Sequence, residues 1–395
     1  MPARIWLDIT GIRPGSDAAI FATCLGAALR AERGEQVQLC RRDPGLRALS
    51  WSDLAGDLGR RRRRGWRGPP LLGLRRLARR LPDRGRAATG RFLRLQRTAL
   101  FAWKRAVLLS LKNFGDAGFR DRITPSSGDT LVMLTPSGDA ARFAVSGTRL
   151  AFVAADAMAL TRPDLMTADD AMQAAIWLRS TLPHVSAVVA FSQSVAHSMA
   201  QAGSLPSPVH IDAAPSLVPI LRRQKATSPG FVLAAGTIGE AGRTRQLLLV
   251  WRSLLDDPPA GGVPILMLAG DIGALVGDML EQLRNSRLFD GHVRLLATPT
   301  PEQMSDLLRT CRFCISPTAA PNWGRAAWDS LAAGVPCLSD SHVADAVAVD
   351  CGDAASVGRA VRAWLAEPPY ANQASGPRHR NWIDVARELL QALAI

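Results

Sequence analysis

The chain has 395 residues, of which 47% are hydrophobic and 21% charged, with six cysteines and a formal net charge of +14. This composition excludes a disordered chain, and the length exceeds that at which one hydrophobic core usually stops growing, so we expect two domains. The sequence contains no apolar run long enough to span a bilayer and no basic-then-apolar leader pattern. We therefore expect a cytoplasmic protein whose cysteines are reduced.

The positive charge is concentrated in residues 60–112, which hold 18 Lys and Arg against one acid, Asp83. This basic segment carries +17, which leaves about −3 on the rest of the chain. Its arginines alternate with Leu and aromatic residues at helical spacing, a pattern typical of amphipathic helices that bind anionic lipid headgroups. A solvated insertion packed on its domain and a nucleic-acid-binding surface are the other interpretations. We favour an anionic membrane surface and expect no nucleic acid partner, because no recognised nucleic-acid-binding motif accompanies the charge.

Apolar strands and helices alternate through the first half of the chain. The predicted strands are RIWLDIT from Arg4, TLVMLT from Thr130, RLAFVAAD from Arg149 and SAVVAFS from Ser186. A helix is expected over residues 18–33, and others after the last two strands. Residues 204–229 hold five prolines and show no helical period, so they are predicted to be a linker.

The same alternation resumes after the predicted linker. The expected strands are FVLAAGT from Phe231, PILMLAG from Pro264, HVRLLA from His292 and FCIS from Phe313, with helices near 245–255, 273–287 and 301–309 and directly after Pro321. This order predicts an α/β fold with two doubly wound parallel-sheet, Rossmann-like domains, residues 1–203 and 230–395, facing a cleft. We expect the last helix to pack back on the first domain, and a ligand to bind in the cleft beyond the carboxyl ends of the strands.

Motifs in both halves resemble those of one enzyme family. The second half contains, in order, FVLAAGTIGEAGRTRQLLLVW, GHVRLLATPTPEQMSDLLRTCRFCISPT, PNWGRAAWDSLAAGVPCLSD and NWIDVARELL. These resemble the nucleotide-sugar domain of GT-B glycosyltransferases of family four, also called group 1. The first half is similar to the acceptor domain of that family in DITGIRPG, LAFVAADAMALTRPDL and AVVAFSQSVAHSMAQAG. The resemblance implies a GT-B-like fold and covers most of the chain outside the basic segment.

The resemblance also implies a donor site on the second domain, without a resident metal or cofactor. Backbone N–H groups at the start of the helix after Gly324 would face the donor diphosphate. Gly236 and Thr237 match a phosphate-binding turn, and Arg243 matches a cation that clamps the diphosphate. Asp329 stands where the family has a ribose-binding carboxylate.

On the acceptor side, the resemblance implies roles for two further residues. Gly15 of RPGSD matches a glycine-rich loop at the cleft. Asp156 keeps the acid of a His-Asp pair at the end of a strand, and we predict a catalytic role for it.

Two positions depart from the family pattern. Ala155 stands in place of the His, and Pro321 in place of a Glu that contacts the sugar, so that role would move to Asn322 or to a backbone group. Two interpretations follow. The first is a hexosyltransferase that moves a hexose from a nucleotide diphosphate sugar to a glycan or lipid-linked acceptor, with retention of configuration. It would act in envelope or exopolysaccharide synthesis, and residues 60–112 would hold it peripherally at the inner face of the membrane. The second is a catalytically silent glycosyltransferase-like partner or scaffold protein.

Overall fold

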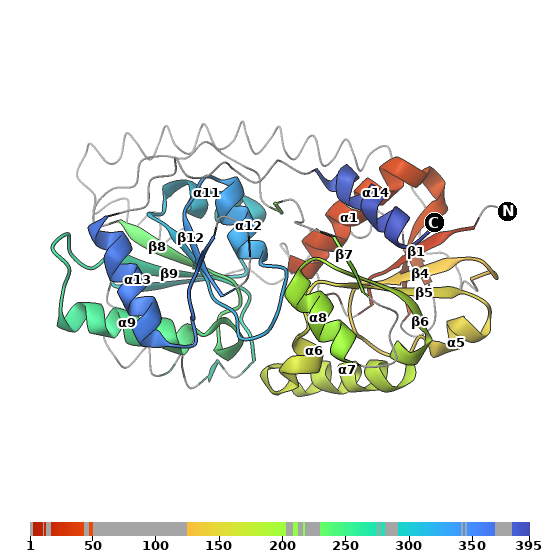
Figure 1. Cartoon of the computed structure of the whole chain (residues 1–395), viewed down its shortest axis with the longest axis horizontal. Coiled ribbons are helices and arrows are strands. Elements are labelled where there is room, and N and C mark those ends of the chain that lie inside the picture. The colour runs from red at the N-terminus through yellow and green to blue at the C-terminus, as the bar shows by residue number, and fades with distance from the viewer. Residues whose placement is uncertain are drawn as a thin grey trace, which may run out of the picture.

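The computed structural model describes residues 3–10, 12, 17–42, 47–49, 125–202, 208–211, 216–217, 230–274, part of 276–281, 291–340, 343, 346–367 and 381–395. Two α/β bodies lie side by side, each built around a largely parallel sheet (Figure 1). The basic segment 60–112 and Gly15 lie outside the described residues. The interpretations of both therefore stay predictions.

In the described part of the chain, the first sheet has seven strands in the order β3-β2-β1-β4-β5-β6-β7. They are β1 (Ile5–Asp8), β2 (Val37–Arg41), β3 (Arg47–Leu49), β4 (Thr130–Met133), β5 (Arg149–Ala154), β6 (Val185–Ala190) and β7 (Val209–His210). Only β3 runs antiparallel among these strands. The sequence prediction placed 204–229 in a linker, but β7 pairs with β6 and Leu217 is buried in the core of this sheet.

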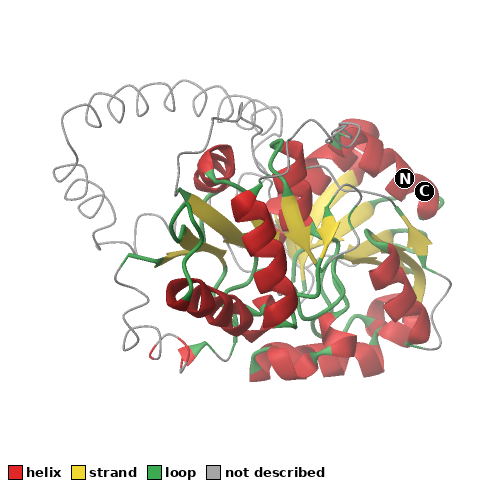
Figure 2. Cartoon of the chain, turned by 60° about the vertical axis from the view of Figure 1, so that its left-hand side comes forward, coloured by secondary structure: helices red, strands yellow, loops and turns green. Residues whose placement is uncertain are grey.

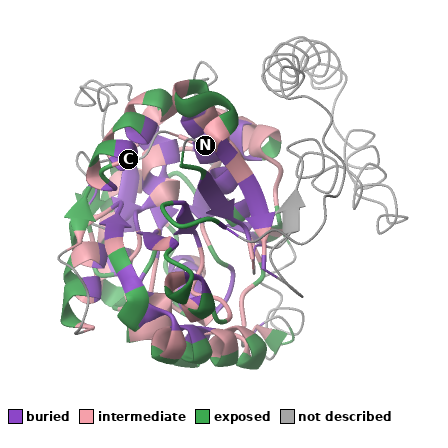
Figure 3. Cartoon of the chain, turned by 90° about the vertical axis from the view of Figure 1, so that its right-hand side faces the viewer, coloured by how far each residue is buried: buried purple, intermediate pink, exposed green. Residues whose placement is uncertain are grey.

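Alternate side chains of each strand enter different cores of the first domain. Ile5 and Leu7 of β1 share a core with α1 (Asp17–Arg33) and α14 (Trp382–Ala392), whereas Trp6 packs with α7 (Ala168–Ser180) and α8 (Gln193–Gln201). This is the period-two pattern of a strand buried on both faces. The short helices α5 (Ala141–Val145) and α6 (Met158–Thr161) complete the domain. Figure 3 shows the buried strands enclosed by helices whose outer faces are exposed.

The last helix of the chain packs on the first domain. Figure 1 shows α14 beside α1, far from the helices that precede it in sequence. Val385, Ala386, Leu389 and Leu390 of α14 are buried in the same core as α1. A capping box begins the helix, because the side chain of Asn381 accepts from the backbone N–H of Asp384 and the carboxylate of Asp384 accepts from that of Asn381.

Six described strands form the second sheet, which is entirely parallel in the order β10-β9-β8-β11-β12-β13. They are β8 (Phe231–Ala235), β9 (Ile265–Gly270), β10 (Val293–Ala297), β11 (Cys314–Ser316), β12 (Cys337–Ser339) and β13 (Val347–Ala348). Helices α9 (Thr244–Asp256) and α13 (Ala354–Ala366) cover one face. Helices α11 (Pro301–Thr310) and α12 (Arg325–Ala332) cover the other. Figure 2 shows helices, in red, packed around the strands, in yellow.

The predicted α/β class with two doubly wound sheets is confirmed. Both sheets start at a central strand and grow outward in two directions, which places crossover helices on both faces. Four 3-10 turns, at Gly34–Gln36, Pro163–Leu165, Leu182–His184 and Glu240–Gly242, join these elements. Within the described residues, every helix is too short or too polar to cross a bilayer.

Candidate functional site

A cavity of about 330 Å³ lies between the two domains. Its first wall consists of residues from α1 and from the loops that follow β4 and β5. Its second wall consists of the loops that follow β8, β9, β10 and β11, together with α11 and the first turns of α12. The carboxyl ends of parallel strands thus meet at this cavity from both sheets, which is where doubly wound folds bind ligands.

The turn after β8 brings Gly236 and Thr237 to the cavity wall, and their contact with a donor stays a prediction. Gly236 has φ 140°, a backbone conformation that favours glycine. The turn is packed closely from behind: a Cβ on Gly270 would lie 1.6 Å from the carbonyl oxygen of Gly236, and one on Gly242 would lie 1.7 Å from that of Thr237. The shape of this turn therefore depends on two glycines that lie outside it.

The start of α12 is shaped by its own side chains. Gly324 is the N-cap in the left-handed conformation, with φ 71°. The carboxamide of Asn322 accepts from the backbone N–H of Gly324 at 2.8 Å and donates to the hydroxyl of Thr318 at 3.0 Å. Asn322 thus fixes the turn at which the helix begins. Asn322 and Arg325, the first residue of the helix, both line the cavity.

The carboxylate of Asp329, predicted to bind ribose, is 3% exposed at the cavity wall. Its Oδ1 accepts from the hydroxyl of Ser216 at 2.7 Å and from the backbone N–H of Leu217 at 2.8 Å. Its Oδ2 lies 3.2 Å from Nε of Arg325. The structure therefore gives Asp329 a role in joining α12 to the chain at 216–217, and ribose binding by this residue stays a prediction.

The cations near the predicted donor site are arranged differently from the sequence expectation. Arg243, with φ 49°, donates from Nε to the carbonyl of Thr318 at 2.7 Å and lies 3.3 Å from Asp340. Among the described residues that line the cavity, Arg325 is the only cation, and Arg243 is outside this set. Sequence reasoning missed Arg325. Its signal was a basic residue directly after Gly324, at the positive end of a helix.

Asp156 extends from the end of β5 to the acceptor-side wall of the cavity. Its carboxylate accepts from the backbone N–H of Met158 at 2.9 Å, which closes a turn before α6. The side chain is exposed at the cavity, yet the two cavity walls partly desolvate this carboxyl and raise its pKa above the ordinary value, while the hydrogen bond from Met158 lowers it in part. A raised pKa means that folding favours the neutral acid over the carboxylate.

Replacing Asp156 with Asn should therefore stabilise the chain slightly at neutral pH, because solvent screens part of the cost of the exposed charge. The pKa of the wild-type carboxyl is higher in the folded state than in the unfolded state. Its contribution to the free energy of unfolding is therefore largest at low pH, where it is protonated, and is lost as the pH rises through the folded-state pKa. Asn keeps an acceptor for Met158 without the charge. Thermal unfolding should give a higher Tm for Asp156→Asn at pH 7, and the difference should shrink toward pH ~3, where both states of the wild type are protonated. A lower Tm for the variant at pH 7 would contradict this interpretation.

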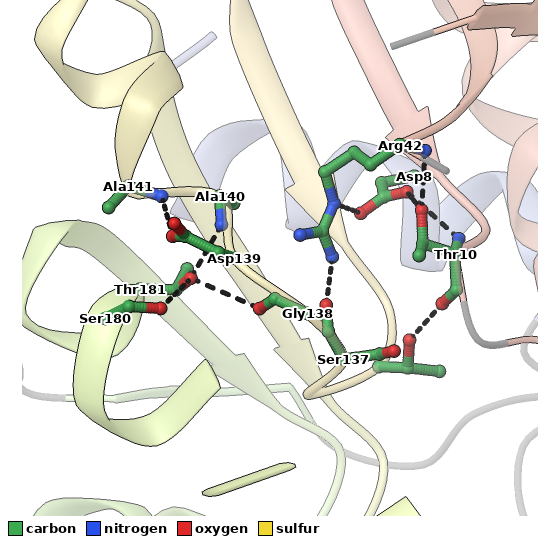
Figure 4. Close-up of polar contacts among 11 residues, drawn as sticks. Asp8, Thr10, Arg42, Ser137, Gly138, Asp139, Ala140, Ala141, Ser180 and Thr181 are labelled. Atoms are coloured by element: carbon green, nitrogen blue, oxygen red, sulfur yellow. Dashed lines mark hydrogen bonds and ion pairs between the residues drawn. The ribbon is translucent and has the colours of Figure 1, made fainter. Parts of the chain in front are cut away.

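A buried network holds the loop after β4 against the cavity (Figure 4). Nε of Arg42 lies 2.6 Å from Oδ2 of Asp8, and both side chains are at most 3% exposed. The same guanidinium donates to the carbonyl of Ser137, and the hydroxyl of Thr135 donates to the carbonyl of Thr10. Thr10 is in turn hydrogen-bonded to Asp8, and Thr135 lines the cavity, so this network positions part of its wall. In the sequence, Asp8 stands at the end of an apolar strand, which is an unusual place for an acid. Its partner Arg42 follows β2, a strand that was not predicted, so the sequence did not indicate the pair.

The described residues contain no group of three His, Cys, Asp or Glu side chains placed to hold a metal ion. The cavity wall nevertheless combines a helix start, one arginine, several hydroxyl groups, the amide of Asn322, and the carboxyls of Asp156, Asp271 and Asp329. Such a wall can hold an anionic group on the α12 side and hydroxyl groups of a ligand on the other.

Comparison with known proteins gives a clear result only at the level of structure. No protein-family model matches the sequence. No curated protein is similar enough in sequence to count as a relative. Solved structures that share the architecture over nearly the whole chain include three proteins.

Sucrose-phosphate synthase from Thermosynechococcus elongatus is 14% identical, with 99% of this chain and 98% of that chain covered and a TM-score of 0.58. HepE of Anabaena in complex with UDP-glucose is 13% identical, with 99% of both chains covered and a TM-score of 0.55. WaaG, a glycosyltransferase involved in lipopolysaccharide biosynthesis, is 12% identical, with 98% and 95% covered and a TM-score of 0.50.

The match to TarM is shorter: it covers 67% of this chain and about half, 51%, of the TarM chain, with a TM-score of 0.46. The three longer matches extend over both Rossmann-like domains of this chain. The chain therefore has the GT-B fold of glycosyltransferases, as the resemblance of its motifs predicted.

Proposed function

We propose that this chain transfers a hexose from a nucleotide diphosphate sugar to a glycan or lipid-linked acceptor in envelope or exopolysaccharide synthesis, with retention of configuration. One observation carries the proposal: the carboxyl ends of both sheets meet at a cavity whose second wall contains the Gly236 turn and the start of α12. Structures of HepE, which has the same fold, hold UDP or UDP-glucose. Uridine diphosphate is accordingly the first ligand to test.

The donor diphosphate would bind between the Gly236 turn and the start of α12. A diphosphate needs positive potential, and the N-terminus of a helix supplies it through backbone N–H groups and the helix dipole. The guanidinium of Arg325, 14% exposed at the first turn, adds a planar set of donors and a positive charge that it shares with Asp329. Asp329 orients this guanidinium through its Oδ2.

The reaction would depend on electrostatic stabilisation by fixed groups. Ala155 and Pro321 supply neither an imidazole nor a carboxylate, so the charge of the leaving diphosphate would be stabilised by Arg325 and by the N–H groups of α12. The carboxyl of Asp156 lies on the opposite wall, where it would face the sugar or the acceptor hydroxyl. Its raised pKa suits a group that exchanges a proton with a hydroxyl.

Replacing Arg325 with Gln should weaken UDP binding about 10- to 100-fold, because a charge-assisted hydrogen bond contributes roughly 1.5–3 kcal/mol. Arg243→Gln is the matched control, since the Arg243 side chain is bound to the carbonyl of Thr318 and to Asp340 and does not itself line the cavity. We expect this control to change the Kd by less than about threefold. Calorimetric titration of both variants tests the assignment. A larger loss in Arg243→Gln would return the diphosphate contact to Arg243, the residue that the sequence indicated.

A catalytically silent partner or scaffold protein is the second candidate. It is favoured by Ala155 and Pro321, whose backbone carbonyls are engaged in contacts between the domains. Release of UDP from UDP-hexoses, measured with membrane extract as the source of acceptor, separates the two functions. UDP release that is lost in Arg325→Gln supports the enzyme, whereas UDP binding without release supports the silent partner.

The basic segment 60–112 would hold the protein at the inner face of the membrane. Its net charge of +17 would attract anionic headgroups, and its Leu and aromatic residues would enter the interface. Liposome pelleting tests this point. Binding that requires anionic lipid and disappears on deletion of 60–112 supports the proposal, and binding that survives the deletion contradicts it.

A further inference from the structure

The segment just before α12 is paired with the first domain along its backbone. The N–H of Ala157 donates to the carbonyl of Pro321 at 2.9 Å, and the N–H of Trp323 donates to the carbonyl of Ala155 at 3.1 Å. Asp156 and Asn322 lie opposite each other between these two bonds, as an antiparallel bridge. Residues 321–323 of the second domain thus extend the end of β5 in the first.

Two further contacts secure the same segment. The hydroxyl of Ser192, the N-cap of α8 after β6, donates to the carbonyl of Asn322 at 2.9 Å. The indole of Trp323 is 8% exposed and belongs to the core of the first domain. Its ring centroid lies 5.8 Å from that of Phe21 and 6.1 Å from that of Phe191. A side chain of the second domain therefore completes an aromatic cluster of the first.

Helix α12 carries a second connection one turn further on. Asp329 accepts from Ser216 and Leu217, and Leu217 is buried in the core of the first domain. The ion pair with Arg325 compensates the buried charge of Asp329. The helix is therefore tied to the first domain both through the segment before it and through a carboxylate within it.

We propose that these contacts form an interdomain latch, made by residues 321–323 on β5 and β6 and by Asp329 on 216–217, which holds the cavity closed before any ligand binds. The latch positions Asp156 and Asn322 facing each other. At Ala155 and Pro321, the two positions where the chain departs from the family pattern, the hydrogen bonds of the latch are made by the backbone carbonyls. Domain closure in this chain is thus a property of the folded protein and does not depend on the proposed donor.

Distance measurement between the domains tests the latch. Spin labels at Met172→Cys on α7 and Leu249→Cys on α9 lie on different domains, at side chains that are 55% and 57% exposed. The native cysteines within the described residues are buried, apart from half-buried Cys24, and burial raises the pKa of the Cys24 thiol to about 12. The two new surface thiols therefore react first.

Pulsed electron paramagnetic resonance should give one narrow distance distribution without ligand, unchanged by saturating UDP. Trp323→Ala should broaden it. Trp364→Ala is the control, because this Trp packs on Phe313 within the second domain at a centroid distance of 5.2 Å, and its loss should leave the distribution narrow. A broad wild-type distribution, a UDP-induced shift, or equal broadening in both Trp variants would each overturn the latch.

A cross-link provides a second test in case Trp323→Ala fails to fold. Cα atoms of a non-hydrogen-bonded antiparallel pair lie about 4.5 Å apart, which is compatible with a disulfide. The double variant Asp156→Cys/Asn322→Cys should therefore form this bond quantitatively under mild oxidation, with no ligand present. Failure to form it would overturn the latch. Neither test requires nucleotide binding, so a chain that binds no UDP refutes the proposed function, while the distance distribution and the cross-link still decide whether the latch exists.

Discussion

Replacing Gly270 with Ala should abolish stable folding of the second domain. The added Cβ would lie 1.6 Å from the carbonyl oxygen of Gly236 and 2.6 Å from its carbonyl carbon. Both atoms belong to the backbone of a turn between β8 and the cavity, so rotation of a side chain cannot relieve the clash. We expect a loss of at least about 4 kcal/mol in the free energy of unfolding, or an insoluble protein. Denaturant unfolding of the purified variant measures this loss.

Gly358→Ala is the matched control for this substitution. Gly358 lies within α13, and a Cβ there would meet nothing within 4 Å. Alanine is the better helix former, so this variant should be as stable as the wild type or more stable by up to about 1 kcal/mol. If Gly270→Ala behaved like the control, the close approach of β9 to the Gly236 turn would be wrong, and with it the shape of the donor side of the cavity.

Replacing Arg42 with Met should cost about 3–5 kcal/mol of stability, the usual result of removing one partner of a buried ion pair. Asp8 is 1% exposed and would keep the hydrogen bonds from Thr10 but lose its compensating charge. The carbonyl of Ser137 would lose its donor as well. Denaturant unfolding at pH 7 measures the loss.

Two further variants show whether the loss in Arg42→Met comes from the buried charge of Asp8. Arg252→Met removes an exposed arginine that pairs with Asp256 on α9, and it should change stability by less than about 1 kcal/mol. The double variant Asp8→Leu/Arg42→Met removes both buried charges and should recover much of the loss. A cost for Arg42→Met as small as that for Arg252→Met would contradict the buried network. In a folded variant, the loop after β4 would lose the contact between Arg42 and Ser137 and would be held by the hydrogen bond from Thr135 to Thr10.

The elements with the strongest apolar patterns could be predicted from the sequence. β8 and the part of β5 after Arg149 are continuous apolar runs, and α11 begins with a capping box of Thr300 and Gln303. β2 was missed because VQLCR is short and ends in charge, and β7 was missed because it lies within a proline-rich stretch. Short strands of this kind form because a sheet edge is available to pair with, and local sequence carries little of that information.

The candidate site was predictable in place but not in its contacts. The motifs located Gly236, Thr237, Asn322 and Asp156 at the cavity wall. They could not show that Asp329 accepts from Leu217, 112 positions away in sequence. Such contacts depend on how two domains pack. For the same reason, the sequence indicated Arg243 by its motif position, although the structure places Arg325 at the cavity.

The central claim is that the cavity between the two domains binds a nucleoside diphosphate. Calorimetric titration of the full chain with UDP tests it most directly. We expect saturable binding of one UDP per chain, weakened by Arg325→Gln and little changed by Arg243→Gln. A correctly folded wild-type chain that gives no binding heat with UDP, ADP, GDP, CDP or dTDP would contradict this claim.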